Sequence, residues 1–199
     1  MRSRDVWHKS PHKVAHEANT EGRYLHFIRH GQYQTVDGYL TELGKRQARY
    51  LARELARIPL ASVVSSDWIR ARQTARLVTN TLGLDGPKQH RLLREVLPTA
   101  VSGMRIPREK RAEGKARLER VIRRFLKPTR GTRHEAIVCH GNLIRALLLR
   151  IGTGRVVPGW DRFSVHHAGI TTFLVTRRGV LIVAYDRVAH LPQRYRTRT

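Results

Sequence analysis

Two histidines in the sequence follow short apolar runs and are each followed by glycine. The triplet Arg29-His30-Gly31 closes the run YLHFI, and the triplet Cys139-His140-Gly141 closes the run AIV. A lone histidine at the end of a strand is most often a structural residue with a hydrogen-bond partner. Two histidines in the same setting, one of them beside an arginine, indicate a shared site.

A further basic side chain, Arg70, follows Ser65-Ser66, which close another β-branched run. Two imidazoles and two guanidiniums in one pocket would repel one another unless an anion lay between them. A phosphoryl group supplies that negative charge, and its oxygens match the paired donors of arginine. The residue types therefore predict a site for a phosphoryl group.

The segments around these residues alternate between strand and helix patterns. Strands are expected at 23–29, 60–66, 135–140, 169–176 and 180–186, a strand or extended edge at 89–98, and helices at 41–58, 67–83, 108–126 and 142–152. This alternation predicts an α/β fold with three layers, in which a mostly parallel central sheet has helices on both faces. The last two strands, joined by Arg177-Arg178-Gly179, are expected to form an antiparallel edge. Sites in such sheets form at the carboxyl ends of the parallel strands, where the basic triplets lie.

Helix ends carry local signals. Thr41 is expected to cap the helix at 41–58, Ser66 or Asp67 the helix at 67–83, and Gly83 to take the left-handed conformation after its end. Asn142 is interpreted as an N-cap rather than as a substrate ligand. Gly141 and Asn142 begin a helix whose unpaired N–H groups favour an anion.

The composition describes a globular chain. A length of 199 residues fits one domain with a single core, and 40% hydrophobic content excludes wholesale disorder. No apolar run approaches the roughly 18 to 20 residues that span a bilayer. Cys139 is the one cysteine, which fits a reducing compartment, and strand alternation points its side chain away from the pocket, as a buried structural residue. No structural metal is expected.

The charge is strongly positive. Lysine and arginine number 39 against 15 acidic residues, which gives a net charge of +24. This surplus attracts anionic partners, among them phosphorylated substrates, acidic proteins and nucleic acid. Against a dedicated nucleic-acid-binding protein, aromatic residues make up 7% of the chain and no recognition signature is present, so only nonspecific, salt-sensitive binding is predicted.

The chain divides into three parts. Residues 1–22 are expected to form a flexible basic extension, with a transit peptide as the alternative, although Asp5, Pro11 and Glu17 weaken an amphipathic helix there. Residues 23–190 form the domain, with a short basic insert at about 98–130, and residues 191–199 form a basic tail. A cytoplasmic location is expected, with a mitochondrial one as the alternative.

Four motifs in order carry a family resemblance. FIRHG, SSDWIRARQTA, LLRE and VCHGN resemble the histidine phosphatase superfamily, also called phosphoglycerate mutase-like, over about Arg23 to Tyr185. Within it, IRHGQYQTVDGYLTELGKRQA, LLRE and EGKARLERVIRRF are most similar to the branch of the mitochondrial phosphoglycerate mutase-family serine/threonine protein phosphatase. The membrane anchor and the tryptophan-rich assembly motif of the animal proteins have no convincing counterpart in residues 1–22, so neither membrane attachment nor ring-like assembly is expected from the resemblance. The oligomeric state stays open, and a dimer is compatible with the sequence.

The resemblance implies roles for particular residues. His30 would be the nucleophile, Arg29, Arg70 and His140 would surround the phosphoryl oxygens, and Glu95 would protonate the leaving oxygen. Gly31 and Gly141 would lie against the phosphate, and Gln32 and Tyr33 would contact substrate, at places where glycolytic mutases carry Ser and Asn. The basic insert would lie over the site and favour a substrate with additional negative charge, although a solvated helix face explains it nearly as well.

These features predict a metal-independent phosphomonoester hydrolase that acts through a phosphohistidine without a cofactor, because fixed cations can replace a metal ion in phosphoryl transfer. The expected substrate is a phosphorylated protein side chain. The alternatives are a small-metabolite phosphatase or mutase with the same first step and, less favoured, a scaffold that has lost catalysis or a nucleic-acid-binding protein.

Overall fold

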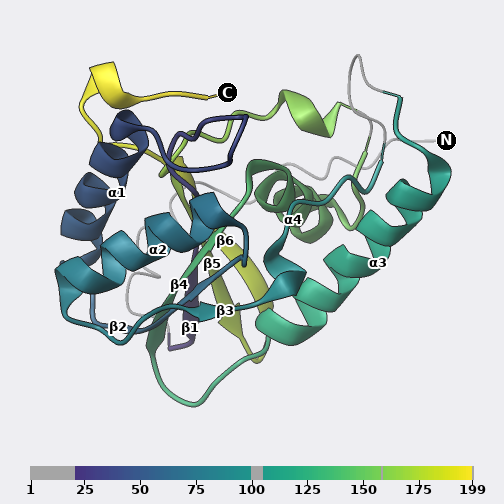
Figure 1. Cartoon of the computed structure of the whole chain (residues 1–199). Helices are drawn as coiled ribbons and strands as arrows, with labels where there is room; N and C mark the ends of the chain where they lie inside the picture. Colours follow the sequence, from purple (N-terminus) through teal and green to yellow (C-terminus); the bar gives the residue numbers. More distant parts are fainter. Residues whose placement is uncertain (1–20, 100–104, 158, 199) are drawn as a thin grey trace, which may run out of the picture.

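A computed structural model describes residues 21–99, 105–157 and 159–198 (Figure 1). The predicted flexible extension thus lies outside the described residues, apart from Glu21 and Gly22. The helices and longer strands are β1 (Arg23–Arg29), α1 (Glu42–Leu55), β2 (Leu60–Ser65), α2 (Ile69–Leu82), α3 (Arg108–Phe125), β4 (Arg133–Cys139), α4 (Gly141–Thr153), β5 (Ile170–Thr176) and β6 (Gly179–Arg187). None of the described helices is both long enough and apolar enough to cross a membrane.

The strands form one sheet in the order β3-β2-β4-β1-β5-β6, where β3 is the short segment Lys88–Gln89. Strands β3, β2, β4 and β1 run parallel to one another, whereas β5 is antiparallel to β1 and β6 is antiparallel to β5. The predicted mostly parallel sheet with an antiparallel hairpin at one edge is confirmed.

Helices cover both faces of the sheet, as predicted. On one face, α1 and α2 pack over Ile28 and Val138, and on the other, α3 and α4 pack over Phe27 and Ile137. Neighbouring residues of β1 and β4 belong to different cores because alternate side chains of a strand point to opposite faces. Each fully buried side chain of this size contributes about 1.5 to 3 kcal/mol.

The predicted strand or extended edge at residues 89–98 is wrong, since strand β3 is only Lys88–Gln89. The pairing with β2 ends at Gln89, because the His90 side chain then accepts a hydrogen bond from the N–H of Leu92 and starts a 3-10 turn at Arg91–Leu93. Glu95 consequently lies in a loop. The apolar pattern of the helix at 108–126 places Ala116 on its buried side, but in α3 Ala116 is exposed and Gly114 is buried against the backbone of Leu97 instead.

The ends of the helices agree with the predicted caps only in part. Thr41 caps α1 by accepting from the N–H of Gly44, and Gly83 adopts a left-handed φ of 64°, both as predicted. The N-cap of α2 is Trp68 and makes no side-chain cap hydrogen bond. Asp67 does not cap this helix because its carboxylate binds Arg94 through two hydrogen bonds of 2.8 and 2.6 Å.

Residues 105–130 of the insert and residues 191–198 of the tail both pack against the rest of the domain. Within the insert, α3 lies beside α4 and is tied to it by the ion pair between Glu119 and Arg150, while residues 100–104 lie outside the described part (Figure 1). The tail packs on α1, where the Gln47 amide donates to the carbonyl of Tyr195 and to Oγ1 of Thr197.

Candidate active site

Three adjacent strands of the sheet end at the same edge and bring the basic residues together. The N–H of His30, after β1, donates to the carbonyl of Cys139 in β4, and the N–H of Ser66, after β2, donates to the carbonyl of Val138. The ring centroids of His30 and His140 lie 5.1 Å apart. The parallel register therefore places the two histidines in one site.

The His30 ring is buried, with 2% of the residue exposed, and both of its nitrogens are engaged. Nδ1 donates to the carbonyl oxygen of Gly31 over 2.8 Å, because a carbonyl can only accept. Nε2 therefore carries the lone pair, and it accepts from Nε of Arg70 over 3.0 Å. Burial, followed by the nearby His140, holds the pKa of His30 well below its ordinary value, so the ring is neutral.

Arg70 is held between two aromatic rings. Its guanidinium carbon lies 4.3 Å from the ring centroid of Tyr33 and 4.5 Å from that of Trp68. Tyr33 also meets the His30 ring edge to face, with centroids 5.0 Å apart. Tyr33 thus lies in the site, whereas the Gln32 side chain accepts from the hydroxyl of Thr41 and stabilises the loop.

Arg29 is fixed by backbone carbonyls. Its Nη1 donates to the carbonyls of Val165 and Arg198, each over 2.6 Å, and its buried Nε has no hydrogen-bond partner among the described residues. Burial lowers the pKa of Arg29 to about 10, which leaves the guanidinium charged at neutral pH.

His140 is fully buried beside Trp68, whose ring centroid is 4.7 Å away. Its Nε2 lies 2.9 Å from Oγ of Ser66, and its Nδ1 has no hydrogen-bond partner in the described part of the chain. Burial and the charges of Arg70 and Arg29 lower the pKa of His140. This ring is therefore neutral as well.

Glu95 joins the site through the start of α4. Its Oε1 accepts from the N–H of Leu143 over 3.0 Å. Burial raises the pKa of Glu95 to about 7, although the hydrogen bond from Leu143 and the charge of Arg29 oppose the shift. A carboxyl group with this pKa is protonated in a large fraction of molecules at neutral pH and can release the proton.

Gly31 and Gly141, the glycines that follow the two histidines, have different surroundings. The N–H of Gly31 donates to Oγ1 of Thr74 and is not directed at a ligand, and a Cβ at this position would lie 2.6 Å from the carbonyl oxygen of Gly44. The lack of a side chain at Gly31 is therefore explained by close packing on α1, not by approach of phosphate to the backbone. Gly141 opens α4 and lies beside Nε of Arg29.

The structure also defines the surroundings of Asn142 and Cys139, which lie close to Gly141 in the chain. Asn142 is not an N-cap, since that position is His140, and its Oδ1 accepts from Nη1 of Arg145. Cys139 is buried on the face covered by α3 and α4, and burial raises the pKa of its thiol, as suits a structural residue.

Trp68 and His167 also lie in the site, although the sequence pattern did not indicate them. His167 is fully buried, its ring centroid lies 5.6 Å from that of His30, and burial lowers its pKa to about 3. The available signal was the pair His166-His167 just before β5. Because β5 is antiparallel to β1, its first residues lie at the edge of the sheet where β1 ends.

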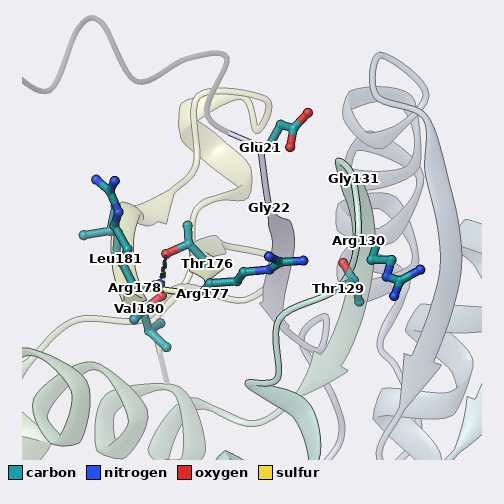
Figure 2. A pocket seen from close by; sticks show the side chains of 11 residues that line it. Glu21, Gly22, Thr129, Arg130, Gly131, Thr176, Arg177, Arg178, Val180 and Leu181 are labelled. Atoms are coloured by element: carbon teal, nitrogen blue, oxygen red, sulfur yellow. Dashed lines mark hydrogen bonds between the residues drawn. The ribbon is translucent and has the colours of Figure 1, made fainter.

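A separate cavity lies at the opposite end of β1. It has a volume of about 900 Å³ and lies between residues 129–131 and the β5–β6 hairpin, from which Arg177 extends towards the start of β1 (Figure 2). Its lining includes Arg130, Arg177 and Arg178 and, among the described residues, one carboxylate, Glu21, and no histidine. No group of three or more His, Cys, Asp or Glu side chains in the described residues could hold a metal ion.

Known proteins resemble the chain in sequence and in structure. The model of the histidine phosphatase superfamily (branch 1) matches residues 25–113 and 98–187. The mitochondrial serine/threonine-protein phosphatase Pgam5 of Caenorhabditis briggsae is 30% identical over 187 residues, which are 86% of this chain and 65% of that protein. Pgam5 of Drosophila mojavensis is 28% identical over 82% of this chain, which spans 62% of that protein.

Two solved structures share the fold. A mycobacterial glucosyl-3-phosphoglycerate phosphatase has a TM-score of 0.65 and 21% identity, with coverage of 84% of this chain and 100% of the other. A phosphoglycerate mutase from Plasmodium falciparum has a TM-score of 0.60 and 22% identity, with coverage of 86% and 95%. With the family model matching most of the described residues, the chain belongs to the histidine phosphatase superfamily.

Proposed function

We propose that this chain is a phosphomonoester hydrolase that acts through a phosphohistidine at His30. The observation that carries the proposal is the anchoring of the His30 ring, in which Nδ1 donates to the carbonyl of Gly31 and the lone pair is left on Nε2. A neutral imidazole held in this way is a nucleophile at neutral pH. The adjacent cations supply a binding site for the phosphoryl group.

In the first step, Nε2 of His30 attacks phosphorus and the bond from phosphorus to the ester oxygen breaks. Glu95 gives its proton to the departing oxygen, a role that its raised pKa supports. Arg29, Arg70 and His140 stabilise the charge on the transferred group, which is the main requirement for catalysis of phosphoryl transfer.

In the second step, the Glu95 carboxylate takes a proton from water, and the water oxygen attacks the phosphorus of the phosphohistidine. The bond from phosphorus to nitrogen breaks, its electron pair returns to Nε2 of His30, and inorganic phosphate leaves. Glu95 is protonated again and His30 is neutral, so both groups are ready for another turnover.

The proposed substrate is a phosphorylated serine or threonine side chain of a protein. Similarity to proteins named serine/threonine-protein phosphatase over more than four-fifths of this chain supports this class. The net charge of +24 favours an acidic phosphopeptide. The relatives are also named mitochondrial, which supports the mitochondrial alternative, and fractionation of cells that express the tagged full chain tests it.

The test of catalysis is hydrolysis of p-nitrophenyl phosphate in EDTA by wild type and His30→Ala. Activity should survive EDTA and be lost in the variant, and rapidly quenched wild type should carry phosphate that is labile in acid and stable in alkali. Absence of activity from folded wild type with several substrates would refute the proposal. Initial rates on phosphoserine and phosphothreonine peptides and on 3-phosphoglycerate then distinguish a protein phosphatase from a metabolite phosphatase.

A further inference from the structure

Three buried nitrogens near His30 lack hydrogen-bond partners among the described residues. They are Nε of Arg29, Nδ1 of His140 and Nε2 of His167, and they come from the ends of β1 and β4 and from the segment before β5. Buried polar groups without a partner are rare in folded proteins, because each costs about 1 to 3 kcal/mol. A ligand that accepts hydrogen bonds would satisfy all three.

His167 belongs to this group by position. Its ring centroid is 5.6 Å from that of His30, and the charges of Arg29 and Arg70 both act on its imidazole. The backbone N–H of His167 donates to the carbonyl of Thr197, which fixes the segment before β5 against the tail. The segment before β5 therefore holds this ring close to His30.

A chain of hydrogen bonds sets the orientation of the His167 ring. The Gln47 side chain accepts from the N–H of Gln32 through Oε1, so its Nε2 is the donor to Oγ1 of Thr197, 2.9 Å away. Oγ1 of Thr197 lies 2.9 Å from Nδ1 of His167. With one lone pair of this oxygen engaged by Gln47, its hydroxyl can donate to Nδ1 of His167, and in that arrangement the ring proton is on Nε2.

We propose that His167 is a third imidazole of the phosphate site, and that its Nε2–H donates to an oxygen of the bound phosphoryl group beside Arg29 and His140. This inference rests on the proposed function. Gln47 and Thr197 are positioning residues, because they act through His167 and do not touch the substrate. The site is thus completed by the segment before β5 and by the tail, in addition to the three parallel strand ends.

The test measures binding of inorganic phosphate and orthovanadate directly by calorimetry, so that it does not depend on turnover. His167→Leu should weaken binding of both anions by about tenfold to a hundredfold, the effect of losing one hydrogen bond to a charged group. His167→Gln, which keeps an N–H donor at nearly the same reach, should recover most of the affinity. His26→Gln is the matched control, since it removes a buried imidazole from β1 that bonds His134 and Thr172 instead.

A second measurement needs no variant with an altered core. In ¹⁵N-labelled wild type, the Nε2 resonance of His167 should shift on addition of phosphate, and Thr197→Val should reduce both the shift and the affinity. Unchanged anion affinity in folded His167→Leu, or an Nε2 resonance that does not respond to phosphate bound by wild type, would overturn the inference. A different result would show that the proposed function is wrong while this inference holds. In that case the anions would bind in a manner that depends on His167, but the wild-type protein would hydrolyse no substrate.

Discussion

Nε of Arg70 lies 3.0 Å from Nε2 of His30 and donates to the lone pair that is proposed to attack phosphorus. This contact favours the reactive tautomer of His30, but the guanidinium also occupies the direction from which phosphorus must approach. Binding of substrate therefore requires Arg70 to exchange His30 for phosphoryl oxygens. The rings of Tyr33 and Trp68 allow the exchange, since they hold the faces of the guanidinium and leave its edges free.

Trp68 should consequently matter for catalysis without touching the reacting atoms. Cation–π contacts contribute about 0.5 to 2 kcal/mol, so Trp68→Leu should lower kcat/KM for p-nitrophenyl phosphate by roughly twofold to thirtyfold. Trp68→Phe retains an aromatic face and should lose less. Steady-state kinetics on both variants, with melting temperatures as a control for folding, provide the measurement, and equal losses in the two variants would contradict this role of the ring.

The pH dependence of kcat/KM should have its alkaline limb near the pKa of Glu95. Burial raises that pKa to about 7, and the protonated carboxyl is the form that can protonate the leaving oxygen. Activity should therefore fall as the pH rises through about 7. His30 has a lowered pKa and stays neutral in this range. Glu95→Gln should be much slower with p-nitrophenyl phosphate and should lack the alkaline limb, whereas an unchanged limb would assign it to another group.

The approach of the loop after β1 to α1 leaves no room for a side chain. A Cβ at Gly44 would lie 1.9 Å from the carbonyl oxygen of Gln32. Gly44→Ala should therefore destabilise the fold by roughly 1 to 3 kcal/mol, as overpacking does, and reduce activity by displacing His30. Gly86→Ala is the control, because a Cβ there meets nothing within 4 Å. Urea denaturation of both variants tests the difference, and a Gly44→Ala variant as stable as wild type would contradict the close approach.

The buried His26 should make the fold sensitive to acid. Burial and the neighbouring His134 lower the pKa of His26 to about 4, whereas the unfolded chain titrates near the ordinary value of 6.5. The unfolded state binds the proton first, so stability present above about pH 6.5 is lost as the pH falls towards 4. The loss from this residue amounts to roughly 3 kcal/mol. The free energy of unfolding of His26→Gln, measured by urea titration, should depend less steeply on pH than that of wild type.

Much of the site could be predicted because it follows from the strand pattern. Apolar runs that end in Arg29-His30-Gly31 and in Cys139-His140-Gly141 become neighbouring parallel strands, and their shared edge brings the two histidines together. Glu95 was identified by family resemblance alone. Its place depends on the 3-10 turn after β3 and on the hydrogen bond from Leu143, neither of which has a local signature.

The presence of Trp68 and His167 in the site could not be predicted, because it also depends on contacts between segments that are distant in the sequence. Trp68 has the sequence context of an ordinary helix start, and its role appears only when Arg70 and Tyr33 are placed beside it. His167 depends on the antiparallel return of β5 and on Thr197, thirty residues further along the chain. Hydrophobic periodicity predicts elements and their faces, but not which loop a distant segment will contact.

The hydrogen bond from Arg29 to the carbonyl of Arg198 joins residues 169 positions apart. In a chain emerging from the ribosome, the His30 loop, α1 and α2 are all synthesised long before Arg198. The central part of the sheet cannot form earlier either, because β1 lies between β4 and β5, which are both synthesised later. Arg29, beside the proposed nucleophile His30, therefore stays unanchored in the nascent chain until residue 198 is synthesised, so the proposed phosphate site can be completed only at that stage.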